Sequence, residues 1–230
     1  MSVHTFHLAK PGFARVARTF LRPPTATQVP GLIHAECMSP MQLGAPIWSP
    51  GRWQAGRLAM FAAWENEGAV DAFLTDTELG RSLATGWHVR LRFLRRWGHV
   101  SACGELPEVA GTTDPDAPVV AVTLARLRLS QTLRFTRWGK PVERLVRDAP
   151  GVALAMAAAR PWRTISTFTV WNSARAMTDM VHGRSAIREP ELHSAAMTER
   201  QRKDFHTEFT TLRFTCIGEF GEWEGRRSIV

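Results

Sequence analysis

Residues 163–185 decide the fold, and they read RTISTFTVWNSARAMTDMVHGRS. Their first part, 165–171, is rich in β-branched and aromatic residues with a period of two, which predicts a strand. The pair 172–173, Asn-Ser, offers N-cap side chains, and apolar residues then recur at helical spacing over 176–181. The stretch therefore predicts a strand, a tight turn and an amphipathic helix that ends at Gly183.

A similar stretch occurs earlier in the chain. Residues 57–83 again join a strand that ends in tryptophan, Trp64, to a short polar turn and an apolar helix, which we expect to continue to Leu83. Each copy is preceded by a short apolar strand that begins beside a glycine, Gly31 or Gly151. The distance between the copies is too long for a solenoid repeat, so it predicts two similar domains.

Each half of the chain has the predicted order β-α-β-β-α-β, which is the ferredoxin-like split βαβ pattern. We divide the chain into a first domain over 1–105, a polar, proline-rich linker over 106–118, and a second domain over 119–230 with one extra helix. A helix over 132–146 is expected to be kinked or split by the glycine and proline within it. The predicted fold class is α+β, with two tandem ferredoxin-like domains whose sheets cover each other in an intrachain pseudo-dimer.

The composition bounds the class of protein. The chain has 230 residues, of which 44% are hydrophobic and 22% charged, as is typical of a globular protein. No stretch approaches eighteen apolar residues without charge, and the N-terminus lacks the apolar region of a signal peptide. The three cysteines are scattered without zinc-site spacing, so we expect a reduced, cytoplasmic location.

The net charge of +8 raises the question of an anionic partner. The arginines are dispersed along the chain, and the densest group is Arg90, Arg92, Arg95 and Arg96. We expect this group to form a solvated strand face, with Arg90 and Arg92 side by side. A nucleic-acid partner is therefore not favoured, whereas a membrane surface stays open as a partner.

The segment 168–177, FTVWNSARAM, followed by His182 and Arg184, resembles the spheroidene monooxygenase family. Weaker similarity extends over most of the chain, and a wider resemblance is to the dimeric α+β barrel superfamily. The heme-degrading members of that superfamily place a tryptophan at a strand end and a heme-ligating histidine on the next helix. Trp171 and His182 are eleven residues apart, whereas the first copy has Thr75 at that distance from Trp64.

The resemblance implies a heme-dependent monooxygenase that acts on a small hydrophobic, carotenoid-like substrate and takes electrons from a donor. It implies that His182 ligates the heme iron and that Arg184 pairs with a propionate. Trp171, Met177 and Phe168 would line the pocket.

Other interpretations of the same residues stay open. His182 also fits a surface histidine in the last turn of a helix, and Trp171 fits a core aromatic residue. His193 is a second candidate for the heme ligand. The alternative function is a non-catalytic ligand-binding or structural α+β barrel protein. The sequence shows no Ser/His/Asp motif, no nucleotide-binding glycine loop and no standard metal spacing, and it does not indicate an oligomeric state.

Overall fold

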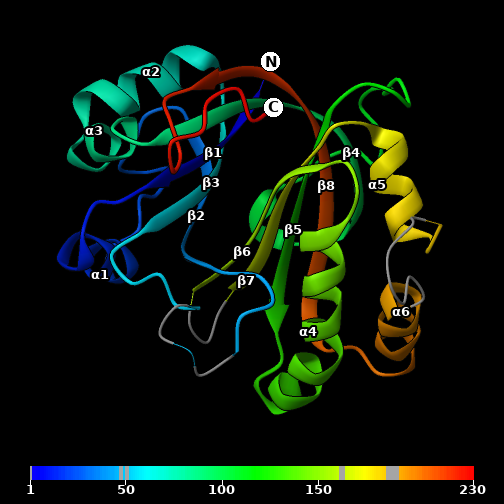
Figure 1. The fold of residues 1–230 in the computed structure, drawn as a ribbon. Helices are drawn as coiled ribbons and strands as arrows, with labels where there is room; N and C mark the ends of the chain where they lie inside the picture. The colour runs from blue at the N-terminus through cyan, green and yellow to red at the C-terminus, as the bar shows by residue number, and fades with distance from the viewer. Residues whose placement is uncertain (1, 47–48, 50–51, 161–163, 185–191) are drawn as a thin grey trace.

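The computed structural model describes residues 2–46, 49, 52–160, 164–184 and 192–230 (Figure 1). These residues form one closed antiparallel barrel with the strand order β1-β3-β2-β6-β7-β5-β8-β4. The strands are β1 Val3–Ala9, β2 Leu32–Met41, β3 Leu58–Trp64, β4 Trp87–His99, β5 Val119–Leu127, β6 Val152–Arg160, β7 Thr164–Trp171 and β8 His206–Phe220.

The two halves of the chain contribute the same strand order to the barrel. That order is β4-β1-β3-β2 in the first half and β8-β5-β7-β6 in the second. Two strand pairings join the halves: β4 pairs with β8 along eleven residue pairs, whereas β2 pairs with β6 along only three, Ser39 to Met41. The fold is thus a mixed α+β structure built on a large antiparallel sheet.

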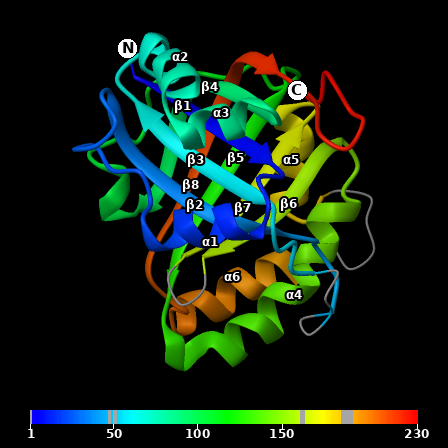
Figure 2. The same ribbon diagram turned by 90° about the vertical axis from the view of Figure 1, so that its left-hand side faces the viewer.

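The helices lie on the outside of the barrel (Figures 1 and 2). Helices α2 and α3 cover the sheet of the first half, and α4 and α5 lie against that of the second. The helices are α1 Phe13–Leu21, α2 Glu67–Asp76, α3 Glu78–Ala84, α4 Thr132–Asp148, α5 Ala174–Val181 and α6 Leu192–Arg202, with 3-10 turns η1 Ser101–Cys103 and η2 Leu129–Gln131. In the described part of the chain, no helix combines the length and the apolar character needed to span a lipid bilayer.

One helix prediction needs correction, and for a second helix one of two expected alternatives is excluded. The helix expected to continue to Leu83 is in fact two helices, because Thr77 has extended backbone angles, φ −98° and ψ 150°. Its hydroxyl accepts a hydrogen bond from the amide of Gly80 at 2.9 Å and so caps α3. Helix α4 is not split, since it continues through Pro141 to Asp148.

Paired glycines mark equivalent places in the two halves. Gly31 precedes β2 with φ 73°, and Gly151 precedes β6 with φ 81°. A Cβ atom would lie 2.4 Å from the Cβ of Ala69 at the first position and 2.8 Å from the Cβ of Ala176 at the second. Each glycine carbonyl also accepts a backbone hydrogen bond from the residue after the strand-end tryptophan, at 2.9 and 2.8 Å. Both halves therefore use a glycine to bring a helix against the strand entry.

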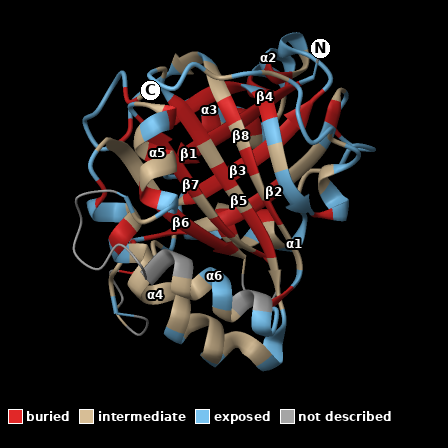
Figure 3. Ribbon diagram, turned by 90° about the vertical axis from the view of Figure 1, so that its right-hand side faces the viewer, coloured by how far each residue is buried: buried red, intermediate tan, exposed pale blue. Residues whose placement is uncertain are grey.

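Side chains fill the barrel interior, and the buried residues concentrate on its strands (Figure 3). The rings of Phe6 and Phe168 stack in this core with centroids 3.8 Å apart. Other large side chains of the same core are Phe61, Trp87, Phe93 and Phe214. A second core lies under α2 and α3 and contains Trp64, Val70, Phe73 and Leu83.

Residues 106–118 contain no helix and no strand, yet they pack against the barrel. Arg95 forms an isolated antiparallel bridge with Val109, and the amide of Ala110 donates to the carbonyl of Leu94 at 2.8 Å. The segment therefore runs along the far end of β4. The division of the chain into domains at this segment stays a prediction.

The expectation of a solvated arginine face on β4 is wrong for Arg90. This residue is buried, and its guanidinium pairs with Glu67 at 2.9 Å and with Asp71. Both carboxylates come from α2, so the pairs connect this helix to the sheet. Arg92 and Arg95 are exposed as expected.

Candidate functional site

The end of α5 presents His182 to solvent. The helix begins as predicted, because the hydroxyl of Ser173 accepts from the amide of Ala176 at 3.1 Å. It ends at Val181, and Gly183 follows two residues later with φ 67°. Nδ1 of His182 lies 2.8 Å from the carbonyl oxygen of Thr178. Because a carbonyl only accepts, Nδ1 carries the proton, and the lone pair of the neutral ring is on Nε2.

The five predicted site residues lie in three environments. His182 and Arg184 share the exposed end of α5. Trp171 and Met177 are buried on the outer side of the sheet, in the core under α5. Phe168 is buried on the inner side, in the barrel core. The barrel wall therefore separates Phe168 from the other four residues.

The two strand-end tryptophans have similar surroundings, although their hydrogen-bond partners come from different strands. Nε1 of Trp64 donates to the hydroxyl of Thr5 at 2.8 Å, and Nε1 of Trp171 donates to the hydroxyl of Thr169 at 2.9 Å. Both indoles are buried, and each packs under the helix that follows its strand. Their polar edges are satisfied within the core, which favours a packing role for both.

The outer faces of the two half-sheets are filled differently. In the first half, His7 and Met60 point outward under the helices and are fully buried. The equivalent positions of the second half, counted from the paired residues Val3–Trp64 and Val119–Trp171, hold Thr123 and Thr167. These threonines are smaller and only half-buried. The outer face of β5 and β7 is therefore less filled than that of β1 and β3.

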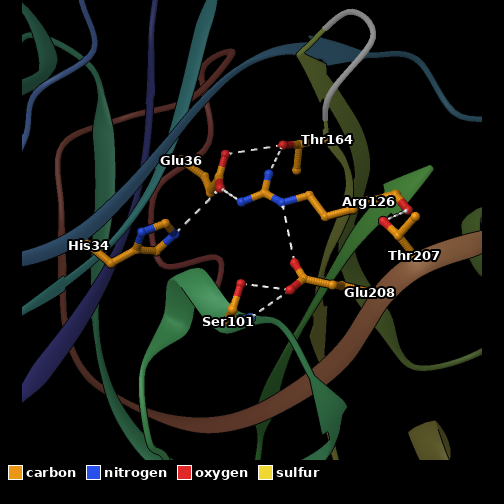
Figure 4. A network of polar contacts seen from close by, with 7 residues as sticks. All are labelled: His34, Glu36, Ser101, Arg126, Thr164, Thr207 and Glu208. Carbon is orange, nitrogen blue, oxygen red and sulfur yellow. Dashed lines mark hydrogen bonds and ion pairs between the residues drawn. The ribbon is translucent and has the colours of Figure 1, made fainter. Parts of the chain in front are cut away.

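A polar cluster links side chains from both halves of the barrel (Figure 4). It consists of residues from β2, β5, β7, β8 and η1, namely His34, Glu36, Ser101, Arg126, Thr164, Thr207 and Glu208. The guanidinium of Arg126 donates to Glu36 and to the hydroxyl of Thr164, and its Nε is 3.9 Å from Glu208. Thr164 in turn donates to Glu36 at 3.2 Å.

This cluster bridges the halves where their backbones do not pair. The β2–β6 ladder covers only Ser39 to Met41, and Glu36 lies beyond it. The side chain of Glu36 is 4% exposed, so its contact with Arg126 is a buried ion pair. Breaking such a pair leaves an uncompensated charge in the protein interior, which is strongly destabilising.

His34 is the member of the cluster with an available nitrogen. Its Nε2 is 3.5 Å from the carboxylate of Glu36 but makes no hydrogen bond within the described structure. Burial lowers the pKa of His34, although the charge of Glu36 opposes this effect. His34 is therefore neutral at physiological pH. The two carboxylates of the cluster, Glu36 and Glu208, both lie against Arg126, so neither is free to act as a base.

Sequence reasoning missed the polar cluster, although a signal for it is present. His34, Glu36 and Met38 alternate in an otherwise apolar strand, which places all three on one face. The inward position of Met38 shows that this face points into the barrel. A charge on such a face calls for an opposite charge from another strand, and Arg126 supplies it.

Comparison with known proteins gives one informative relative. No protein-family model matches the chain. A spheroidene monooxygenase of Rubrivivax gelatinosus is 30% identical over 181 residues, a match that covers 76% of this chain and 66% of the relative. The chain is thus similar to a spheroidene monooxygenase over about three quarters of its length. The match spans slightly less than two thirds of the relative's own length.

Solved structures resemble this chain in fold. An aldoxime dehydratase in complex with butyraldoxime matches with a TM-score of 0.50 and 9% identity, over 96% of this chain and 79% of that one. A ferredoxin-fold protein of Listeria monocytogenes, related to antibiotic biosynthesis monooxygenases, matches with a TM-score of 0.33 and 8% identity over 97% of each chain. At such identities the first match supports the fold alone.

Heme is the cofactor that the family resemblance implies, and the exposed end of α5 fits it in part. His182 offers what a ligand needs, since its Nδ1–H is held by a carbonyl and its Nε2 lone pair is available. Arg184 is exposed, with its guanidinium 3.1 Å from Asp179. Trp171 and Met177 do not form a pocket with His182, because both are enclosed in the core. The side chain of His193, the second candidate, lies outside the described residues.

The remaining metal-binding residue types do not form a site in the described part of the chain. No group of three histidine, cysteine or acidic residues there could hold a metal ion. Cys103 packs near the polar cluster, where burial and then the charge of Glu36 raise its pKa to about 12. The Cys103 thiol is therefore protonated and not a nucleophile at physiological pH.

Proposed function

We propose that the chain is a heme-dependent monooxygenase that acts on a hydrophobic, carotenoid-like substrate. The observation that carries the proposal is the 30% identity to the spheroidene monooxygenase of Rubrivivax gelatinosus, whose name states both a substrate and a reaction. A monooxygenase places one atom of O2 in the substrate, and the other is reduced to water by two electrons from a donor together with two protons. A bound heme would supply the activation of O2.

In this proposal the chain's own residues hold the cofactor at the end of α5. His182 would ligate the iron through Nε2, while the carbonyl of Thr178 fixes the ring by accepting from Nδ1. Arg184 would exchange its exposed contact with Asp179 for a heme propionate. If His182 is not the ligand, His193 is the next candidate.

We place the hydrophobic substrate against the outer face of the second half-sheet. The half-buried threonines Thr123 and Thr167 occupy positions where the first half has fully buried large side chains. The barrel interior is a poor alternative because aromatic residues such as Phe6 and Phe168 fill it. Small side chains on a partly covered face suit a flat or elongated apolar ligand.

The fold of the enzyme is proposed to be an intrachain pseudo-dimer of two tandem ferredoxin-like domains. The shared strand order supports this proposal, as do the equivalent pairs Gly31 with Gly151 and Trp64 with Trp171. In such an arrangement one copy can keep a packing role while the other takes up a cofactor. The second copy alone has a histidine eleven residues after its tryptophan.

The test begins with the cofactor. The protein is expressed with added iron and a heme precursor, purified, and examined for a Soret band. We expect His182→Ala to shift that band or to lower heme affinity. The matched control is His99→Ala, which removes another exposed histidine, at the end of β4. An unchanged Soret position and affinity in His182→Ala would exclude His182 as the ligand and direct attention to His193.

The activity is tested separately. Purified protein is incubated with spheroidene, O2 and a chemical reductant, and the product is analysed by mass spectrometry for a gain of one oxygen atom. Labelled O2 should transfer its label to the product. A wild-type protein that binds no heme and yields no oxygenated product would overturn the proposal in favour of a non-catalytic ligand-binding barrel.

A further inference from the structure

Two arginines stand opposite each other on the outer face of the barrel, across the β4–β8 pairing. Arg95 of β4 and Arg213 of β8 are direct cross-strand partners. Both guanidinium groups lie over the ring of Trp97, with their central carbons 4.8 and 4.9 Å from its centroid. Trp97 is 38% exposed, so solvent reaches this group. Like charges placed directly opposite on neighbouring strands destabilise a sheet.

The charges of this pair have no counter-ion in the described structure. Neither Arg95 nor Arg213 has an acidic partner there, whereas Arg90 on the same strand has two. Nε of Arg213 is buried and has no hydrogen-bond partner. Burial, and then the positive charge of Arg95, lower the pKa of Arg213. A half-buried cation with an unsatisfied donor beside a second cation requires a compensating group.

We propose that Arg95, Arg213 and Trp97 form a binding site for an oxyanion group, a phosphate or carboxylate carried by a ligand. Guanidinium groups present paired N–H donors that match the oxygens of such anions. One anion would offset the repulsion between the arginines and accept from their terminal N–H groups. The site is distinct from the end of α5, and it needs neither heme nor O2. Its test is therefore independent of the proposed activity.

The test measures thermal stability of the full chain against phosphate concentration at constant ionic strength, with chloride as the balancing anion. A ligand that binds only the folded state raises the melting temperature, by about 3–6 °C at ten times its Kd for a protein of this size. We expect this increase in the wild type and its loss in Arg95→Gln and Arg213→Gln. The matched control is Arg92→Gln, an exposed arginine on the same strand that should keep the full response.

Arg95→Gln is the more decisive variant because Arg95 is exposed and its loss does not disturb the core. Without phosphate, this variant should melt no lower than the wild type, since it removes the like-charge contact. A second arm compares acetate, and a third compares vesicles with and without phosphatidylglycerol, to distinguish free anions from lipid headgroups. A phosphate response that survives in both arginine variants, or that chloride reproduces, would overturn the proposal.

Discussion

The buried pair of Glu36 and Arg126 gives the sharpest test of how the barrel is held together. The perturbation is Glu36→Gln, which keeps the size of the side chain and removes its charge. Arg126 would then lie with only 16% of its side chain exposed and without its closest carboxylate. Losing one partner of a buried ion pair costs about 3–5 kcal/mol. We expect the lower end of that range, because Arg126 keeps the hydroxyl of Thr164 and the carboxylate of Glu208.

The assay is urea unfolding at pH 7, followed by tryptophan fluorescence and by circular dichroism, with the free energy of unfolding from linear extrapolation. The double variant Glu36→Leu with Arg126→Met replaces both charges with apolar groups. It should recover most of the loss, to within about 1 kcal/mol of the wild type, because no charge is left unpaired. The matched control is Glu222→Gln, which removes a surface contact with Arg227 and should change stability by less than about 1 kcal/mol.

Two results would refute this reasoning. A loss below about 1 kcal/mol in Glu36→Gln would mean that solvent already screens the pair. A double variant that loses as much as the sum of its single changes would mean that the two residues are not energetically coupled. In Glu36→Gln the pKa of His34 should also be lower than in the wild type, because the Glu36 carboxylate favours the charged form of the histidine.

Three further predictions concern other parts of the chain. Burial lowers the pKa of His4 and of His88 to about 4, below their ordinary value of 6.5, so the unfolded chain binds more protons between these values. The free energy of unfolding should therefore fall as pH decreases from 6.5 to 4, and His88→Phe should flatten that dependence in urea titrations; an equally steep slope in the variant would contradict it. Gly151→Ala should lower stability by more than 1 kcal/mol, because its φ is 81° and its Cβ would meet Ala176; a melting temperature equal to the wild type would exclude this clash. Ser173→Ala should lower the free energy of unfolding by about 1 kcal/mol, because α5 loses its cap, and it should make amide exchange in that helix faster. Exchange as slow as in the wild type would contradict this prediction.

The local pattern of the sequence predicts most elements of this fold. The strand that ends in Trp171, the cap at Ser173 and the glycine at the end of α5 all follow from residue type and spacing. The break between α2 and α3 did not follow, because Thr77 changes a continuous apolar pattern through one side-chain cap. The burial of Arg90 depends on two carboxylates from another element, which periodicity along a single strand does not report.

The candidate site was harder to predict for the same reason. Helical spacing identified the end of α5 and its exposed histidine. It did not show that the sheet separates Phe168 from Met177, because the side of a strand that faces the barrel interior depends on closure of the whole sheet. The contact of Glu36 with Arg126 joins residues ninety positions apart and likewise exists only after closure.

The unequal contacts between the halves give the barrel an order of opening. Breaking the three-pair ladder from Ser39 to Met41 releases few backbone hydrogen bonds, whereas the eleven pairs of β4 with β8 must open together. The amide protons of the short ladder should therefore exchange with solvent through a small local fluctuation, and those of the long one only through unfolding of the whole domain. The two halves are therefore joined firmly along β4 and β8, whereas on the side of β2 and β6 they are held by a short ladder and by two ion pairs, Glu36 with Arg126 and Arg52 with Glu143.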